Sequence, residues 1–294
     1  MNPFRKPKAI LFFALSLMVI GEGSVVLMGI VNSGALPRPP KECFSVEKEY
    51  DKWTCFKPYF EELTSKASAV YAMNEAKRLK VERVLDDCHL TAHHIGEANL
   101  AKHNFDAGQA FATCDFGCIE GCFHGVMEGY VRSDPDPSAV LERIGSMCKN
   151  VAPDDRTKKA VLLRGQCAHG LGHGLVAHGF VSIPQALEAC QSIVDGHYAT
   201  RCSGGVAMEH VEQYLGLDGN DLKEALPEIC APFEGLDDEG AVFTCIENIG
   251  VGLMFYTKHD LPRSKELCEE LQKSQYIATC KSGAEEEEVI NLTG

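Results

Sequence analysis

Residues 112–129 read Ala-Thr-Cys-Asp-Phe-Gly-Cys-Ile-Glu-Gly-Cys-Phe-His-Gly-Val-Met-Glu-Gly, and this stretch decides the fold. Cys114 ends one segment, and Cys122, eight residues later, opens the next. The opening cysteine, followed by small, apolar and His or Glu residues, recurs along the chain at intervals of 34 to 45 residues. Such periods are typical of one helical hairpin per copy. The copies begin at Cys88, Cys122, Cys167, Cys202, Cys245 and Cys280.

A second series of cysteines precedes the later copies, and most of its members end an amphipathic pattern such as Ala-Leu-Glu-Ala-Cys at 186–190. We therefore expect a helix that ends in cysteine, a loop, a helix that begins with cysteine, and a disulfide across the joint. Sequence alone does not prove the connectivity. Thiolate metal binding is the alternative, but paired CxxC knuckles are absent. The expected pairs are Cys43–Cys55, Cys88–Cys118, Cys114–Cys122, Cys148–Cys167, Cys190–Cys202, Cys230–Cys245 and Cys268–Cys280.

Residues 112–129 resemble the cysteine-rich Sel1-like helical repeats, which are relatives of the tetratricopeptide repeats. Those repeats also place one cysteine on each side of a tight hairpin joint. The resemblance covers one copy well and residues 110–290 loosely, because the other joints are longer and His-Gly replaces the usual Leu-Gly. It implies an α/α solenoid that binds partners. The expected fold is all-α, with disulfide-clamped helical hairpins that form an α/α solenoid or a closed toroid.

The N-terminal residues predict export. Arg5, Lys6 and Lys8 precede apolar runs at 9–20 and 25–31, and a basic region before an apolar stretch is typical of a secretory signal or an uncleaved anchor. The Lys/Arg cluster stays on the cytoplasmic side, and fourteen cysteines fit an oxidising compartment. We expect a protein on the periplasmic or secreted side, anchored through one N-terminal membrane helix. Its expected parts are a cytoplasmic basic region (1–8), a signal anchor or signal peptide (9–31), a proline-rich linker (32–42) and an exported helical-repeat domain (43–294).

The charge balance excludes several classes of partner. The chain carries 28 Lys and Arg against 42 Asp and Glu, which gives a formal net charge of -14. A duplex-binding surface is basic, so no nucleic acid is expected as a partner. An anionic membrane surface is disfavoured for the same reason, which leaves the N-terminal helix as the expected membrane contact.

Histidines and glutamates fall on one face of the recurring segments. When each segment is numbered from its cysteine as zero and turned by 100° per residue, positions 2, 5, 6 and 9 share a face. Because neighbouring helices of a repeat lie side by side, these side chains converge, and they predict a site for zinc, iron, manganese or copper. His89 falls at the edge of this face, and Glu209 and His210 fall beside it. The candidate ligands are His93, His94, Glu97, His124, Glu128, His169 and His173.

No catalytic motif narrows the function further. HExxH, Gly-x-Ser-x-Gly, a Walker loop, a dinucleotide fingerprint and CxxCH are all absent from the sequence. The leading hypothesis is a metal site, in a metalloenzyme or a metal-handling protein. The alternative is an extracytoplasmic interaction scaffold, whose concave face binds a protein and whose histidines form a hydrogen-bonded structural seam. A thiol–disulfide oxidoreductase is disfavoured, because CxxC near a βαβ pattern is missing.

Overall fold

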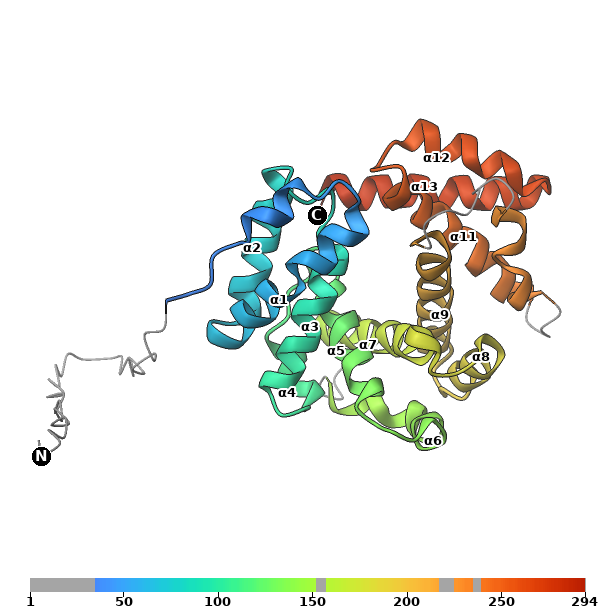
Figure 1. Cartoon of the computed structure of the whole chain (residues 1–294). Coiled ribbons are helices and arrows are strands. Elements are labelled where there is room, and N and C mark those ends of the chain that lie inside the picture. Colours follow the sequence, from blue (N-terminus) through green and yellow to red (C-terminus); the bar gives the residue numbers. More distant parts are fainter. Residues whose placement is uncertain (1–34, 152–156, 217–224, 235–238, 294) are drawn as a thin grey trace, which may run out of the picture. The chain divides into compact units, whose positions relative to one another are not determined.

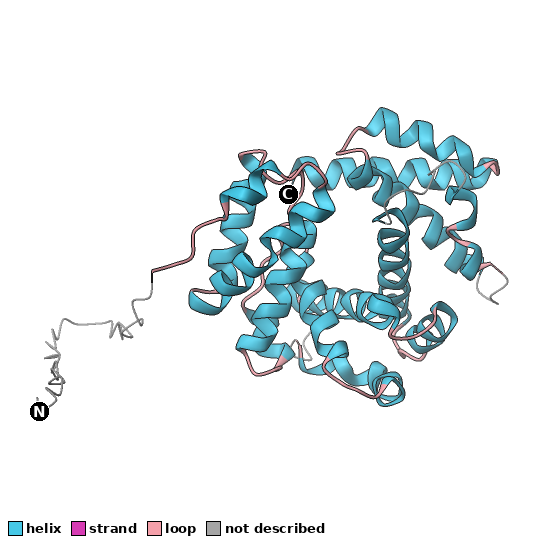
Figure 2. Ribbon diagram, in the orientation of Figure 1, coloured by secondary structure: helices cyan, strands magenta, loops and turns pink. Residues whose placement is uncertain are grey.

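Every regular element in the part of the chain that the structure describes is helical, as Figure 2 shows. The structure is a computed structural model, and it describes residues 35–151, 157–216, 225–234 and 239–293. The all-α expectation is confirmed for these residues. None of their helices combines the length and the apolarity that crossing a bilayer requires. The expected signal or anchor at 9–31 lies outside the described residues.

Most of the outer helices begin at a residue whose side chain caps them. The Ser68 hydroxyl accepts a hydrogen bond from the amide of Tyr71 at 3.1 Å, and the Asp260 carboxylate accepts one from the amide of Arg263 at 3.0 Å. Such caps satisfy amide groups that have no partner within the helix. The helices of this outer set are α1 (Glu49–Lys66), α2 (Ala69–Val81), α4 (Ala107–Ala112), α6 (Pro137–Met147), α8 (Ile183–Gln191) and α12 (Leu261–Cys268).

Six further helices carry the recurring segments, and each packs against the next one along the chain (Figure 1). Most of the outer helices join consecutive members of this inner set, as helical hairpins require. Equivalent side chains of neighbouring inner helices therefore come close together. The inner helices are α3 (His89–Lys102), α5 (Gly121–Arg132), α7 (Lys158–Val176), α9 (Gly196–Gly216), α11 (Glu239–Tyr256) and α13 (Ser274–Thr293).

Seven disulfides clamp the hairpins and the N-terminal lead-in, and they are the seven pairs that the spacing predicts. Five of them join the end of one segment to the next inner helix, across 8 to 19 residues. The expectation that each inner helix begins with its cysteine is wrong for α7, α9, α11 and α13, which begin at least six residues earlier. Cys43–Cys55 fixes the lead-in to α1, and Cys88–Cys118 closes 30 residues around α3 and α4. Seven disulfides are typical of an oxidising, extracytoplasmic environment.

Glycines let the inner helices touch backbone to backbone. A β-carbon at Gly125 of α5 would lie 1.9 Å from the carbonyl oxygen of His93 on α3. A β-carbon at Gly205 of α9 would lie equally close to the carbonyl oxygen of His169 on α7. Both approaches are shorter than any side chain tolerates, which explains glycine inside a helix despite its low helix propensity.

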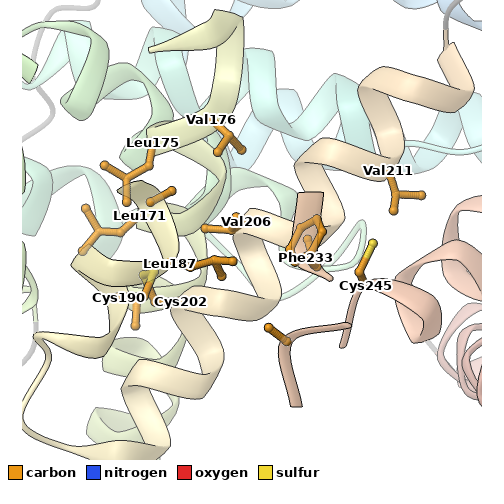
Figure 3. Close-up of a cluster of buried hydrophobic side chains, with 14 of the residues drawn as sticks. Leu171, Leu175, Val176, Leu187, Cys190, Cys202, Val206, Val211, Phe233 and Cys245 are labelled. Atoms are coloured by element: carbon orange, nitrogen blue, oxygen red, sulfur yellow. A yellow bond between two sulfur atoms is a disulfide. The ribbon is translucent and has the colours of Figure 1, made fainter. Parts of the chain in front are cut away.

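The apolar core forms two clusters. The smaller one joins α1, α2 and α3 through Phe56, Phe60 and Met73, all fully buried. The larger one runs from the end of α3 to α13. Figure 3 shows its middle, where Leu171 and Val206 lie near the Cys190–Cys202 disulfide and Phe233 lies beside Cys245. Dense packing of this kind fixes the inner helices in place, and so fixes the polar side chains that they carry.

Candidate metal centre

Five histidines from three consecutive inner helices lie together in the interior, and we call them the histidine cluster. α3 and α7 each supply two, four residues apart and therefore one turn apart on the same face. α5 supplies the remaining one. Their exposed fractions lie between 0 and 6%. The histidine cluster consists of His89, His93, His124, His169 and His173.

His124 occupies the middle of the cluster. Its ring centroid lies 5.4 Å from that of His89 and 5.3 Å from that of His93. It lies 4.8 Å from the centroids of both His169 and His173. Among the described residues its Nδ1 has no hydrogen-bond partner. A buried polar atom without a partner costs free energy, and a bound ion is one way to satisfy it.

Backbone carbonyls fix the orientation of one ring in each helical pair. His89 Nδ1 donates to the carbonyl oxygen of Cys118 at 3.1 Å, and His169 Nδ1 donates to that of Arg201 at 3.1 Å. Because a carbonyl oxygen only accepts, the proton of each neutral ring must sit on Nδ1. The lone pair of both rings is therefore on Nε2.

Carboxylates face the other ring in each pair. His173 Nδ1 donates to Glu209 Oε2 at 3.0 Å. His93 Nδ1 lies 2.8 Å from Glu128 Oε1; that oxygen makes no well-directed hydrogen bond, so the contact is mainly electrostatic. Carbonyl and carboxylate partners of this kind orient most histidines that bind metals through the opposite nitrogen.

The opposite nitrogens meet in two pairs. Nε2 of His93 lies 3.1 Å from Nε2 of His89, and Nε2 of His173 lies 3.3 Å from Nε2 of His169. Two nitrogens bound at about 2.0–2.1 Å to one tetrahedral ion are about 3.3 Å apart. Each pair therefore has the spacing of two ligands of a single metal ion.

The ligand atoms form three groups in which all members lie within 4.8 Å of one another. Two groups contain only histidines and share His124. The third combines His173 with two carboxylates. The groups are His89, His93 and His124; His124, His169 and His173; and Glu128, His173 and Glu209.

Burial keeps three imidazoles of the cluster neutral. Removal from water, with a smaller contribution from the neighbouring His173, lowers the pKa of His93 to about 3. Burial also lowers the pKa of His124 and His169 well below the usual value, and neighbouring imidazoles add to the effect. A neutral imidazole is the form that binds metals, so these rings are in the metal-binding state at neutral pH.

Buried carboxylates surround the histidine cluster. Burial, followed by the negative charge of Glu209, raises the pKa of Glu128, and the same two causes raise the pKa of Glu212 strongly. Glu212 Oε1 has no hydrogen-bond partner among the described residues and lies 3.8 Å from His89 Nε2. Burial also acts on Glu209, but hydrogen bonds, mainly from His173, lower its pKa overall. A cation in the cluster would offset the repulsion between these groups.

A left-handed turn carries one of the orienting carbonyls. Cys118, Ile119 and Glu120 have φ angles of 52°, 50° and 62°, a conformation that costs about 1–2 kcal/mol per residue for L-amino acids. The disulfides Cys88–Cys118 and Cys114–Cys122 hold the turn. Strain of this kind gathers at functional sites, and here it directs the Cys118 carbonyl at His89.

Two of the predicted ligands lie outside these groups. His94 is half-buried beside the cluster, and Glu97 pairs with Arg132 at 2.9 Å and Lys57 at 3.6 Å. Glu97 and Arg132 line an outer cavity of about 860 Å³, which the histidine cluster does not line. The structure brings together the other five predicted residues, which are His93, His124, Glu128, His169 and His173.

Counting helix positions from each cysteine also missed three residues of the centre. His89 lies one turn before His93 on the inner face, so α3 is rotated by one residue relative to α7. The i,i+4 spacing of these two histidines is visible in the sequence and would have identified the pair. Glu209 lies among the ligand atoms rather than beside them. Glu212 had no sequence pattern that pointed to it.

Comparisons with protein-family models, with curated proteins and with solved structures find no match for this chain. The chemistry of the centre therefore follows from its own residues.

Proposed function

We propose that this chain is an extracytoplasmic metalloprotein that binds transition-metal ions in the histidine cluster. One observation carries the proposal. The Nε2 atoms of two histidine pairs lie 3.1 and 3.3 Å apart, while Nδ1 of each of these rings is turned to a carbonyl or carboxylate oxygen. This separation suits two ligands of one metal ion.

A hydrogen-bonded structural seam explains this arrangement less well. In a seam each imidazole nitrogen would find a partner of opposite polarity. Here His124 Nδ1 and Glu212 Oε1 lack hydrogen-bond partners among the described residues. The donor atoms also narrow the choice of metal. Imidazole suits zinc, copper and iron, whereas manganese prefers oxygen ligands.

The finer architecture that fits this function is a closed α/α ring with the centre on its inner side. Contacts between the first and fifth inner helices support it. The ring of His89 lies 5.8 Å from that of Phe255 on α11, and Lys258, just after α11, pairs with Asp86, just before α3, at 2.6 Å. The export of this unit is assigned to residues 9–31, acting as a signal anchor or a signal peptide.

Elemental analysis of the untagged full chain, purified in detergent from an oxidising compartment, tests the function. We expect at least one equivalent of zinc, copper or iron per chain, and the same content in the matched variant His94→Gln. A variant that carries both His93→Gln and His169→Gln should lose the metal. Less than about 0.1 equivalent in the wild type, unchanged after incubation with divalent ions and dialysis, contradicts the proposal.

A further inference from the structure

The histidine cluster contains the same arrangement twice. α3 and α7 each present two imidazoles one turn apart, whose Nε2 atoms meet at 3.1 and 3.3 Å. In each helix the first ring donates through Nδ1 to a backbone carbonyl of the following hairpin. The second ring faces a glutamate of the next inner helix. Each pair is thus oriented completely without the other.

One ion does not accommodate both pairs. Two ligands bound at about 2.1 Å to the same ion are at most about 4.2 Å apart. The nitrogens satisfy a limit of 4.8 Å only as two three-histidine groups, one on each side of His124, and the five do not form a single group. Two adjacent positions fit this arrangement, with His124 between them.

The charge of the surroundings is compatible with either one or two ions. Glu128, Glu209 and Glu212 lie around the five imidazoles, and their side chains are exposed by only 10, 14 and 17%. When ionised they carry three negative charges in a region of low polarity, which is costly without cations. One divalent ion leaves a net charge of -1 and two leave +1, so the charge calls for a cation and the nitrogen positions set the number of ions.

We infer that the histidine cluster holds two divalent transition-metal ions side by side, one on the His89–His93 pair and one on the His169–His173 pair, with His124 between them. The inference rests on the proposed function and adds the number of ions and their positions. The ions belong to the class that accepts imidazole nitrogen, of which Cu²⁺ and Co²⁺ are suitable probes. Two positions that share a neighbouring ligand place the ions close enough to interact magnetically.

A metal titration of the full chain, stripped with chelator, tests the inference. We expect two equivalents of Co²⁺ in the wild type and in His94→Gln, which changes a neighbouring residue outside the ligand groups. His93→Gln and His169→Gln should each bind one equivalent, and the double variant none. Native mass spectrometry of the wild type alone counts the ions without relying on any variant, and circular dichroism checks that each variant is folded.

Electron paramagnetic resonance of the Cu²⁺-loaded protein gives an independent readout. The wild type should show a signal weakened or broadened by coupling between two ions, whereas each single variant should show the full signal of one isolated ion. One equivalent in the wild type, abolished by either single variant, overturns the two-ion inference and leaves the proposed function standing. No bound metal in the wild type overturns both.

Discussion

The carbonyl oxygen of Cys118 accepts a hydrogen bond from Nδ1 of His89 at 3.1 Å, and a disulfide ties Cys118 to Cys88, the residue directly before that histidine. The same covalent link therefore holds the turn that presents the carbonyl and the start of the helix that presents the ring. Since the carbonyl determines which nitrogen carries the proton, this disulfide also helps to turn the Nε2 lone pair of His89 towards the proposed metal position.

Removal of this disulfide should weaken metal binding as well as the fold. In the double variant Cys88→Ala/Cys118→Ala we expect a loss of about 3–4 kcal/mol in the free energy of unfolding, from the loop of 30 residues that the bond closes. We also expect metal affinity to fall by about 10- to 100-fold, as it does when a partner that orients a ligand is lost. Denaturant unfolding and a competitive chelator titration measure the two effects.

The matched control is Cys43→Ala/Cys55→Ala, which opens a 12-residue loop in the lead-in. This loop should contribute about 3 kcal/mol, so the two variants lose similar stability, but the control keeps its metal affinity. Equal affinity losses in both variants would mean that the Cys88–Cys118 bond acts only through global stability.

The close approach of α3 and α5 should tolerate no added carbon. Gly125→Ala places a β-carbon 1.9 Å from the carbonyl oxygen of His93, a backbone atom that cannot turn away. We expect a loss of about 3 kcal/mol or more in the free energy of unfolding, because the helices must separate. Gly165→Ala in α7, where a β-carbon meets no atom within 4 Å, should instead stabilise the protein by about 0.5–1 kcal/mol. Thermal unfolding of the two variants measures both effects.

The helical hairpins and their disulfides could be predicted because both follow from local spacing. A cysteine at the end of one segment and another at the start of the next, as in Cys114 and Cys122, can meet across a short joint with little dependence on the rest of the fold. The convergence of the histidines was predictable for a similar reason, since successive inner helices are neighbours.

The exact membership of the centre depends on contacts between helices that the sequence does not encode locally. A rotation of α3 by one residue brings His89 inward and turns His94 and Glu97 outward to Lys57 and Arg132. One residue corresponds to 100° of rotation, and tight glycine contacts with α5 set it. Glu212 enters the centre only because of how α9 packs, so no spacing within its own segment identifies it.

Acid should destabilise the metal-free protein through the half-buried His94. Burial, followed by the positive charge of Lys57, lowers the pKa of His94 to about 4, from an ordinary value of 6.5. The unfolded chain therefore binds more protons than the folded one between these values. The stabilising contribution is present above pH 6.5 and is lost as the pH falls towards 4, at up to about 1.4 kcal/mol per pH unit for one group.

His94→Gln isolates this contribution without touching the ligand groups. We expect its free energy of unfolding, measured in urea with chelator present, to fall less steeply between pH 6.5 and 4 than that of the wild type. The difference in slope should be up to about 1.4 kcal/mol per pH unit, which is the contribution of one proton. His197→Gln, which changes an exposed histidine at the start of α9, serves as the control and should retain the wild-type slope. Identical slopes for His94→Gln and the wild type would show that His94 is not protected from protonation.

Alkaline pH should act in the opposite sense through Glu287 of α13. This side chain is 2% exposed and its Oε1 has no hydrogen-bond partner among the described residues. Burial, followed by the charge of Asp87, raises its pKa to about 8 from 4.5. The folded state therefore holds a proton that the unfolded chain has released, and the stabilising contribution that is present below pH 4.5 is lost as the pH rises through 8.

Glu287→Gln removes this loss, so at pH 9 the variant should be more stable than the wild type by about 2 kcal/mol, with little difference at pH 4. Glu288→Gln changes the adjacent, half-buried carboxylate and should follow the wild type at both pH values. If Glu287→Gln is no more stable than the wild type at pH 9, the prediction is wrong and a partner within the fold stabilises the ionised carboxylate.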